Sequence, residues 1–118
     1  MMSGKIVLAL VKDLFFRSKL DVVAGQVGAE VGYASDLDGA ARRCIELKPS
    51  LVIVDLSDAA FPAAASCEKI RAEAPGARIV GFASHVDLKP LRAAKDAGFA
   101  LALSRSEFTA KLAELLKD

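Results

Sequence analysis

The strongest constraint on the fold comes from two uninterrupted apolar runs, Ile6 to Leu10 and Leu51 to Val54. A strand with one face in water alternates apolar and polar residues, whereas these runs are typical of central strands covered on both faces. The five expected strands are Lys5–Leu10, Glu30–Tyr33, Leu51–Val54, Arg78–Phe82 and Phe99–Leu103. Helical patterns separate them, so the sequence predicts an α/β fold with one parallel sheet in which the first and third strands are neighbours.

Apolar periodicity and capping residues predict five helices between and after these strands. They run from about Leu14 to Gln26, Leu37 to Leu47, Ala63 to Glu73, Leu88 to Ala97, and from near Ser106 to the end of the chain. Asp13 and Asp87 stand at N-cap positions, Ser35 and Asp36 are both candidates to cap the second helix, and Gly98 suits a left-handed helix end. The expected inward faces contain Phe16, Leu20, Val23 and Val27; Leu37, Ala41, Cys44 and Ile45; and Phe108, Leu112 and Leu115.

Length and charge set the broad class of protein. The length leads us to expect that residues 1–118 form a single domain with no output domain. We also expect a cytoplasmic protein, because no apolar stretch suits a signal peptide or a membrane span. Sixteen basic and fifteen acidic residues give a formal charge of +1, which supplies no broad field for nucleic acid or for a membrane surface. Cys44 and Cys67 fit no metal-binding spacing, so we expect two reduced, partly buried thiols.

Asp55 is the leading candidate for chemistry, because it closes the buried run Leu51 to Val54. Burying a charge is costly, and ligands of parallel α/β sheets bind beyond the carboxyl ends of the strands. A purely structural alternative is that Asp55 accepts backbone N–H groups in the turn before 56–58. We favour a functional or ancestral site.

These landmarks, taken together, resemble the receiver domain of bacterial two-component response regulators, the CheY-like (βα)5 family with a doubly wound, flavodoxin-like sheet. The resemblance rests on the run from Leu51 to Leu56, Lys12-Asp13 after the first strand, Ala83-Ser84-His85 after the fourth, and Ala97-Gly98. It implies that Asp55 accepts a phosphoryl group from a histidine kinase. It also implies Mg²⁺ as cofactor, held by Asp13 and Asp55.

Several positions depart from the receiver pattern. Lys12 replaces the first acid of the acidic pair, Arg105 replaces the phosphate-pairing lysine, Ala102 replaces the switch aromatic, and Ala83 replaces the hydroxyl residue, with Ser84 one place late. Asp13 and Asp55 facing Lys12 and Arg105 sum to zero charge, so a divalent ion would leave the cleft positive. The sequence therefore predicts a degenerate receiver whose site holds no metal and in which Lys12 or Arg105 pairs with Asp55.

Three functions follow, and the first is favoured. The chain is expected to be a stand-alone, phosphorylation-independent interaction module for another signalling protein, a histidine kinase or an effector, with the basic helix face Lys89, Arg92 and Lys95 as the contact. The alternatives are a receiver phosphorylated on Asp55 with Mg²⁺, and a homodimeric scaffold with an inert cleft. We expect no enzyme, because no nucleotide-binding motif is present and His85 is the single histidine.

Overall fold

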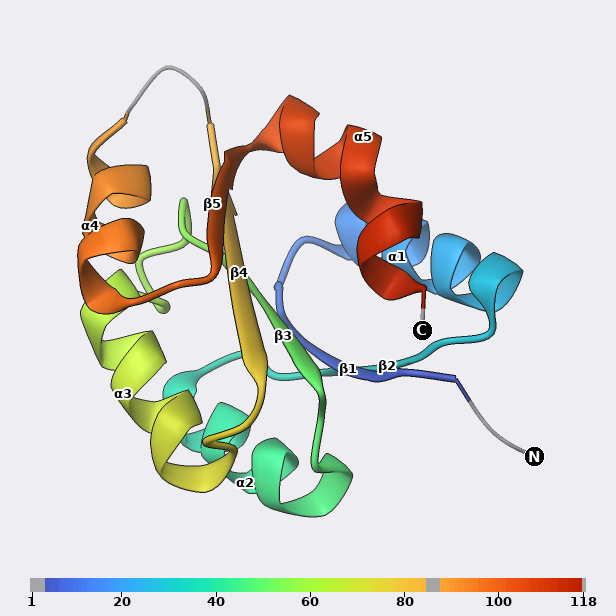
Figure 1. Cartoon of the computed structure of the whole chain (residues 1–118), viewed down its shortest axis with the longest axis horizontal. Coiled ribbons are helices and arrows are strands. Elements are labelled where there is room, and N and C mark those ends of the chain that lie inside the picture. The colour runs from blue at the N-terminus through green and yellow to red at the C-terminus, as the bar shows by residue number, and fades with distance from the viewer. Residues whose placement is uncertain (1–3, 85–87, 118) are drawn as a thin grey trace.

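In the part of the chain that the structure describes, ten elements alternate strictly between strand and helix (Figure 1). The computed structural model describes residues 4–84 and 88–117. The strands are β1 Ile6–Leu10, β2 Glu30–Tyr33, β3 Leu51–Asp55, β4 Arg78–Ala83 and β5 Leu101–Ser104. The helices are α1 Leu14–Val27, α2 Leu37–Leu47, α3 Ala63–Glu73, α4 Lys89–Ala97 and α5 Arg105–Leu116.

The sheet is parallel throughout, with strand order β2-β1-β3-β4-β5. The predicted pairing of the first and third strands is confirmed, with Val7 opposite Leu51 and Leu10 opposite Val54. Every residue of β3 is buried, because neighbouring strands flank it and helices cover both of its faces. The order reverses between β1 and β3, so the carboxyl ends of these strands define the crevice where ligands of such sheets bind.

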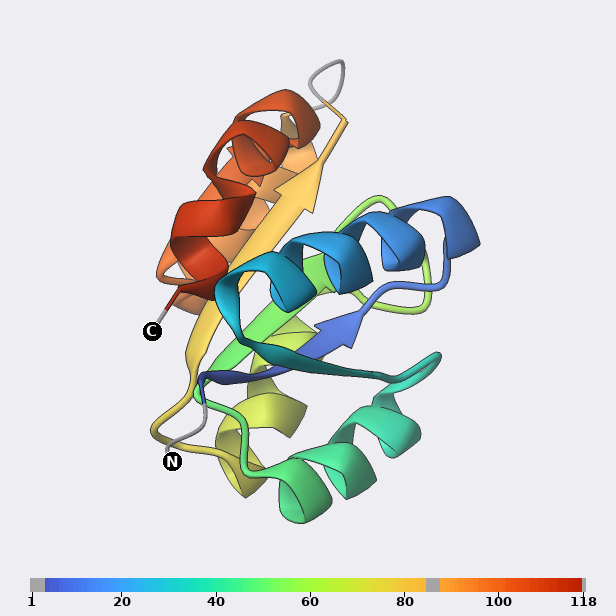
Figure 2. The same ribbon diagram turned by 90° about the vertical axis from the view of Figure 1, so that its right-hand side faces the viewer.

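Helices cover the sheet in two layers (Figures 1 and 2). One layer contains α1 and α5, which pack together, and the other contains α2, α3 and α4. Beneath α1 and α5, the ring of Phe82 lies 4.9 Å from Phe16 and 4.6 Å from Phe108, centroid to centroid. The opposite core packs around Phe61 and Ile70, which are fully buried.

Capping residues fix the helix ends much as the sequence predicts. Asp13 and Asp36 cap α1 and α2, and Gly98 ends α4 in the left-handed region at φ 103°. The predicted cap Asp87 lies outside the described residues. No helix in the described part of the chain is long and apolar enough to cross a membrane.

Two sequence expectations are wrong. Ile45 was expected on the inner face of α2, but it is 58 % exposed and Ala40 is fully buried in its place. Strand β5 begins at Leu101 rather than Phe99, because the Phe99 N–H still bonds the Ala94 carbonyl in the turn that ends α4. Both thiols, Cys44 and Cys67, are free and buried as expected.

Lys48, which ends α2, is the one non-glycine residue with positive φ in the described ranges, at 49°. A side chain in this region clashes with its own backbone, at a cost of about 1–2 kcal/mol. We expect Lys48→Gly to raise the free energy of unfolding by ~0.5–1 kcal/mol, after subtracting the extra entropy of glycine in the unfolded chain. Urea denaturation checks this, and an unchanged midpoint would contradict it.

Candidate functional site

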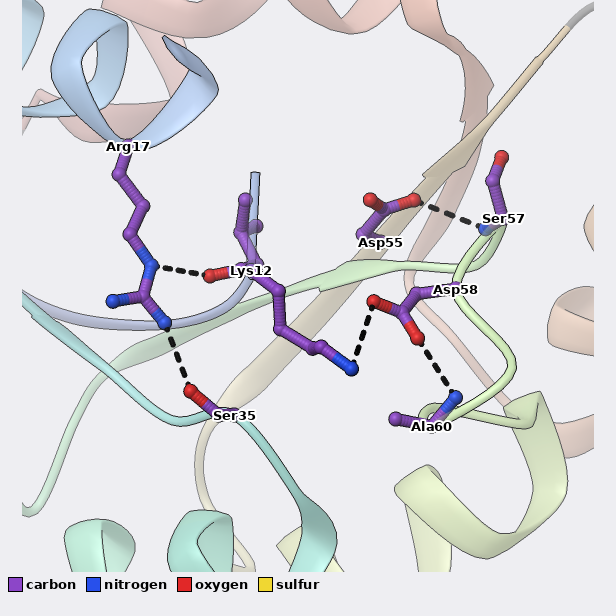
Figure 3. Close-up of polar contacts among 8 residues, drawn as sticks. Lys12, Arg17, Ser35, Asp55, Ser57, Asp58 and Ala60 are labelled. Carbon is purple, nitrogen blue, oxygen red and sulfur yellow. Dashed lines mark hydrogen bonds and ion pairs between the residues drawn. The ribbon is translucent and has the colours of Figure 1, made fainter. Parts of the chain in front are cut away.

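Asp55 ends β3 at the carboxyl edge of the sheet, and the residue is only 7 % exposed. Its Oδ1 atom accepts the Ser57 backbone N–H at 3.0 Å (Figure 3). This bond is the turn contact that the structural alternative predicted. It gives one carboxylate oxygen a hydrogen-bond partner. The cost of burying the negative charge must be offset by other groups around Asp55.

Lys12 extends from the end of β1 toward Asp58, not toward Asp55 (Figure 3). The Lys12 ammonium lies 3.7 Å from Oδ2 of Asp58, and the other Asp58 oxygen accepts the Ala60 N–H at 2.8 Å. The predicted pairing of Lys12 with Asp55 is therefore wrong, because the loop after β3 carries a second acid within reach of the same cation. Asp58 is the site residue that the sequence analysis missed. Its place three residues after Asp55 was the available signal.

Asp13 serves as the N-cap of α1. Its Oδ1 atom accepts the N–H groups of Phe15 at 2.9 Å and Phe16 at 3.3 Å. These donors belong to the unpaired first turn of the helix, so the carboxylate has a structural task that stabilises α1 by roughly 1 kcal/mol. The capping prediction is confirmed.

Arg105 is the first residue of α5, directly after the N-cap Ser104, which forms a capping box with Glu107. Its guanidinium carbon lies 5.1 Å from the Phe16 ring centre and 5.5 Å from that of Phe82. The predicted pairing of Arg105 with Asp55 is also wrong, since no ion pair of Asp55 occurs within residues 4–84 and 88–117. Aromatic faces attract the guanidinium and hold it above the core.

Burial raises the pKa of the Asp55 carboxyl above its ordinary value. The Ser57 N–H and the charge of Arg105 oppose this effect, whereas the carboxylates of Asp58 and Asp13 add to it. Arg105 thus acts on Asp55 through space and not by contact. The carboxylate is less favoured in this cleft than it would be in water.

Ser84 lies across the cleft from the loop that follows β3. Its backbone N–H donates to the Ser57 hydroxyl oxygen at 3.2 Å. A cavity of about 250 Å³ opens beside this contact, lined by Leu56, Ser57, Ala83, Ser84 and Pro90. Ser84 thus lines this cavity, and its backbone N–H makes the bond to Ser57.

Arg17 fixes the backbone from which Lys12 projects. Its Nε donates to the Val11 carbonyl at 2.6 Å, and its Nη2 donates to the Ser35 hydroxyl at 3.2 Å (Figure 3). The guanidinium also lies 4.7 Å from the Tyr33 ring centre. Arg17 was not singled out from the sequence, because these contacts join segments that only the fold brings together.

With Asp58 included, the cleft holds three carboxylates and two cations, a formal charge of −1, and the predicted value of zero is corrected. Asp13 and Asp55 are the residues that would hold Mg²⁺ if it bound. A hard divalent ion needs several oxygen ligands, and here an ammonium sits among them. Across residues 4–84 and 88–117, no three acidic, histidine or cysteine side chains form a group that could hold a metal.

The basic face of α4 is exposed at Lys89, Arg92 and Lys95. Beside it, Leu88, Leu91, Arg92 and Lys95 line a cavity of about 200 Å³, and Leu88 is 64 % exposed. This helix thus combines an apolar recess with positive charge. His85, to which the sequence analysis assigned no chemistry, lies outside the described residues.

Comparisons with known proteins add the class of fold. The sequence matches no family profile and no curated protein. Its structure is similar to that of a putative response regulator from Chloroflexus aurantiacus J-10-fl, with a TM-score of 0.81 and 18 % identity over 96 % of this chain and 94 % of that one. It is also similar to the chemotaxis response regulator CheY4 of Vibrio cholerae, with a TM-score of 0.79 and 17 % identity over 98 % and 97 % of the two chains.

A third similar structure is the receiver domain of the sensor histidine kinase PA1611 from Pseudomonas aeruginosa PAO1. The TM-score is 0.78 with 17 % identity, over 97 % of this chain and 95 % of that one, and that structure has a magnesium ion coordinated in its active-site cleft. The chain therefore has the CheY-like receiver fold, as predicted. At this level of identity the likeness extends to the fold alone.

Proposed function

We propose that this chain is a receiver-like signalling protein that binds a partner protein without being phosphorylated and without Mg²⁺. One observation carries the proposal: the Lys12 ammonium lies in the acidic cleft, 3.7 Å from Asp58. A tethered cation offsets acidic charge there, as a bound ion does in other sites, but it brings no open coordination position for a phosphoryl oxygen.

The fate of the other cleft groups supports the same proposal. Asp13 is engaged in capping α1, and Arg105 is held over Phe16 and Phe82. Position 102 is alanine, whose methyl group cannot change rotamer to report a modification. A switch needs a ligand that binds two states differently, and these residues provide little to distinguish the states. We therefore assign the chain no catalytic step of its own.

We infer that the partner contacts α4, where Lys89, Arg92 and Lys95 flank the recess lined by Leu88 and Leu91. An apolar recess with a basic rim suits an amphipathic acidic segment of another signalling protein, such as a kinase or an effector. The apolar part supplies affinity, and the basic rim supplies orientation and rate of association.

A helical peptide with one leucine face and one glutamate face tests this surface by fluorescence anisotropy. We expect the double variant Arg92→Glu, Lys95→Glu to bind it at least ~10-fold more weakly, because two attractions become repulsions. The matched control Lys69→Glu, Lys111→Glu makes the same charge change on α3 and α5. Equal loss in both variants would show only a general charge effect and would contradict the assignment to α4.

The second candidate is a receiver phosphorylated on Asp55, and Asp58 is the observation that favours it. This acid could compensate for the carboxylate missing at position 12, because both Asp58 and Asp13 act electrostatically on Asp55. The ion pair with Lys12 weighs against it, since Mg²⁺ would have to displace the ammonium. Wild-type binding of Mg²⁺ in its physiological range would favour this candidate.

A further inference from the structure

The outer face of α1 carries three of the large exposed apolar side chains among the described residues. Phe15 is 91 % exposed, Leu14 73 % and Val22 61 %. Single exposed apolar residues are ordinary, but three on one helix form a patch of the kind that marks an interaction site. Neither the cleft nor the basic face of α4 uses these side chains.

Small residues lie between the large ones along the same line of α1. Phe15, Ser18, Val22 and Gly25 are all exposed and recur at the i, i+3, i+7, i+10 spacing of a helix-pairing seam. A side chain built at Gly25 would meet nothing within 4 Å, so an open notch lies over this residue. Glycine inside a helix is less favourable than alanine, and an exposed glycine leaves room for a second helix to approach closely.

We propose that this chain forms a homodimer in which α1 packs antiparallel against α1 of a second copy. With the two-fold axis level with Leu20, Phe15 lies opposite Gly25 of the other copy, and Val22 lies opposite Ser18. Each large side chain thus meets a small residue, which is the arrangement that fills space between close helices. The seam is complementary to itself, and this favours a second copy over an unrelated helix.

The charges along this layer permit self-association. The chain carries a formal charge of only +1, so two copies barely repel each other. On α1 the seam is flanked by Lys19 on one side and Asp21 on the other, and the Asp21 carboxylate accepts the Tyr33 hydroxyl at 2.6 Å, away from the seam.

The available area indicates a weak dimer. One helix face falls short of the ~800 Å² per partner that stable complexes bury. Helix α5 lies beside α1 (Figure 2) and exposes the small residues Ser106, Ala110 and Ala113. Two adjacent helices, each about 20 Å long and about 10 Å wide, present a face of about 400 Å², roughly half of that area. We therefore expect a dissociation constant in the range of roughly 10–100 µM.

Sedimentation velocity of the wild type, over a concentration range that spans this value, tests the proposal. We expect the weight-average sedimentation coefficient to rise from monomer toward dimer. Phe15→Lys and Gly25→Leu should each weaken association at least ~10-fold, the first by placing charge in the seam and the second by filling the notch. Because the notch is open in the monomer, Gly25→Leu should leave the folded chain intact, as thermal denaturation will check.

Ile45→Lys is the matched control, since it removes an exposed apolar side chain on α2. It should associate as the wild type does. Register is tested by mixing the single variants Ser18→Cys and Val22→Cys under oxidation, and the mixture should cross-link faster than either variant alone. A wild type that stays monomeric at every concentration would overturn the proposal, as would weakening by Ile45→Lys equal to that by Phe15→Lys.

Discussion

Lys12→Asp is expected to raise the affinity of the cleft for Mg²⁺. The change removes an ammonium from the cleft and adds a carboxylate beside Asp13 and Asp55, so the local charge falls by two. Unit charges a few ångströms apart in a half-solvated cleft interact with energies on the order of 1–4 kcal/mol. We therefore expect Mg²⁺ affinity at least ~100-fold higher than that of the wild type, which corresponds to ~2.7 kcal/mol.

Isothermal titration calorimetry measures this difference directly, with Lys111→Asp as the matched control on α5. A second readout is stability. Without Mg²⁺ the variant should unfold more easily, because Asp58 loses its ion pair and a fourth acid joins the cleft. Added Mg²⁺ should restore that loss. Equal Mg²⁺ affinity in wild type and variant would refute the view that Lys12 is what keeps the ion out.

Asp55→Asn is expected to stabilise the fold by about 1–2 kcal/mol at neutral pH. Asp55 is 7 % exposed, and burial raises its pKa, so the folded chain disfavours the charged form. The asparagine carbonyl can still accept the Ser57 N–H. The sequence-based pairing with Lys12 or Arg105 predicted the opposite, namely a stranded cation and a loss of stability.

The pH dependence follows from the raised pKa of Asp55. The folded chain holds this proton more tightly than the unfolded chain, so the group favours folding at low pH. That contribution is lost as pH rises from the unfolded value, about 3.9, through the raised folded value. The advantage of Asp55→Asn should therefore grow across this window and stay constant above it. Urea denaturation of both proteins over the acid range checks this, and a less stable variant would reinstate the pairing.

The fold could be predicted from the sequence because the burial of a strand or helix determines the local pattern of apolar residues. A strand covered on both faces must be continuously apolar, so Ile6 to Leu10 and Leu51 to Val54 marked the centre of the sheet. Helix starts could also be predicted because capping is local: a carboxylate such as Asp13 accepts N–H groups only two or three residues away.

The site was predictable in its position and not in its contacts. That Asp55 closes a central strand follows from spacing, but the choice of Asp58 by Lys12 depends on how the loop after β3 turns. The position of the Arg105 guanidinium could not be predicted from neighbouring residues, because the rings that it contacts, Phe16 and Phe82, belong to α1 and β4. Ile45 was wrongly predicted to be buried because the apolar face of α2 is wider than the part of the helix that packs against the rest of the fold.

Treatment of the purified protein with acetyl phosphate and Mg²⁺, followed by intact mass measurement, tests most directly whether the chain works without phosphorylation. A receiver domain known to label serves as the positive control, and Asp55→Asn identifies the site. We predict that the control gains one phosphoryl group and that this chain gains none. A single adduct on the wild type that disappears in Asp55→Asn would contradict the proposed function and make Asp55 a phosphoacceptor.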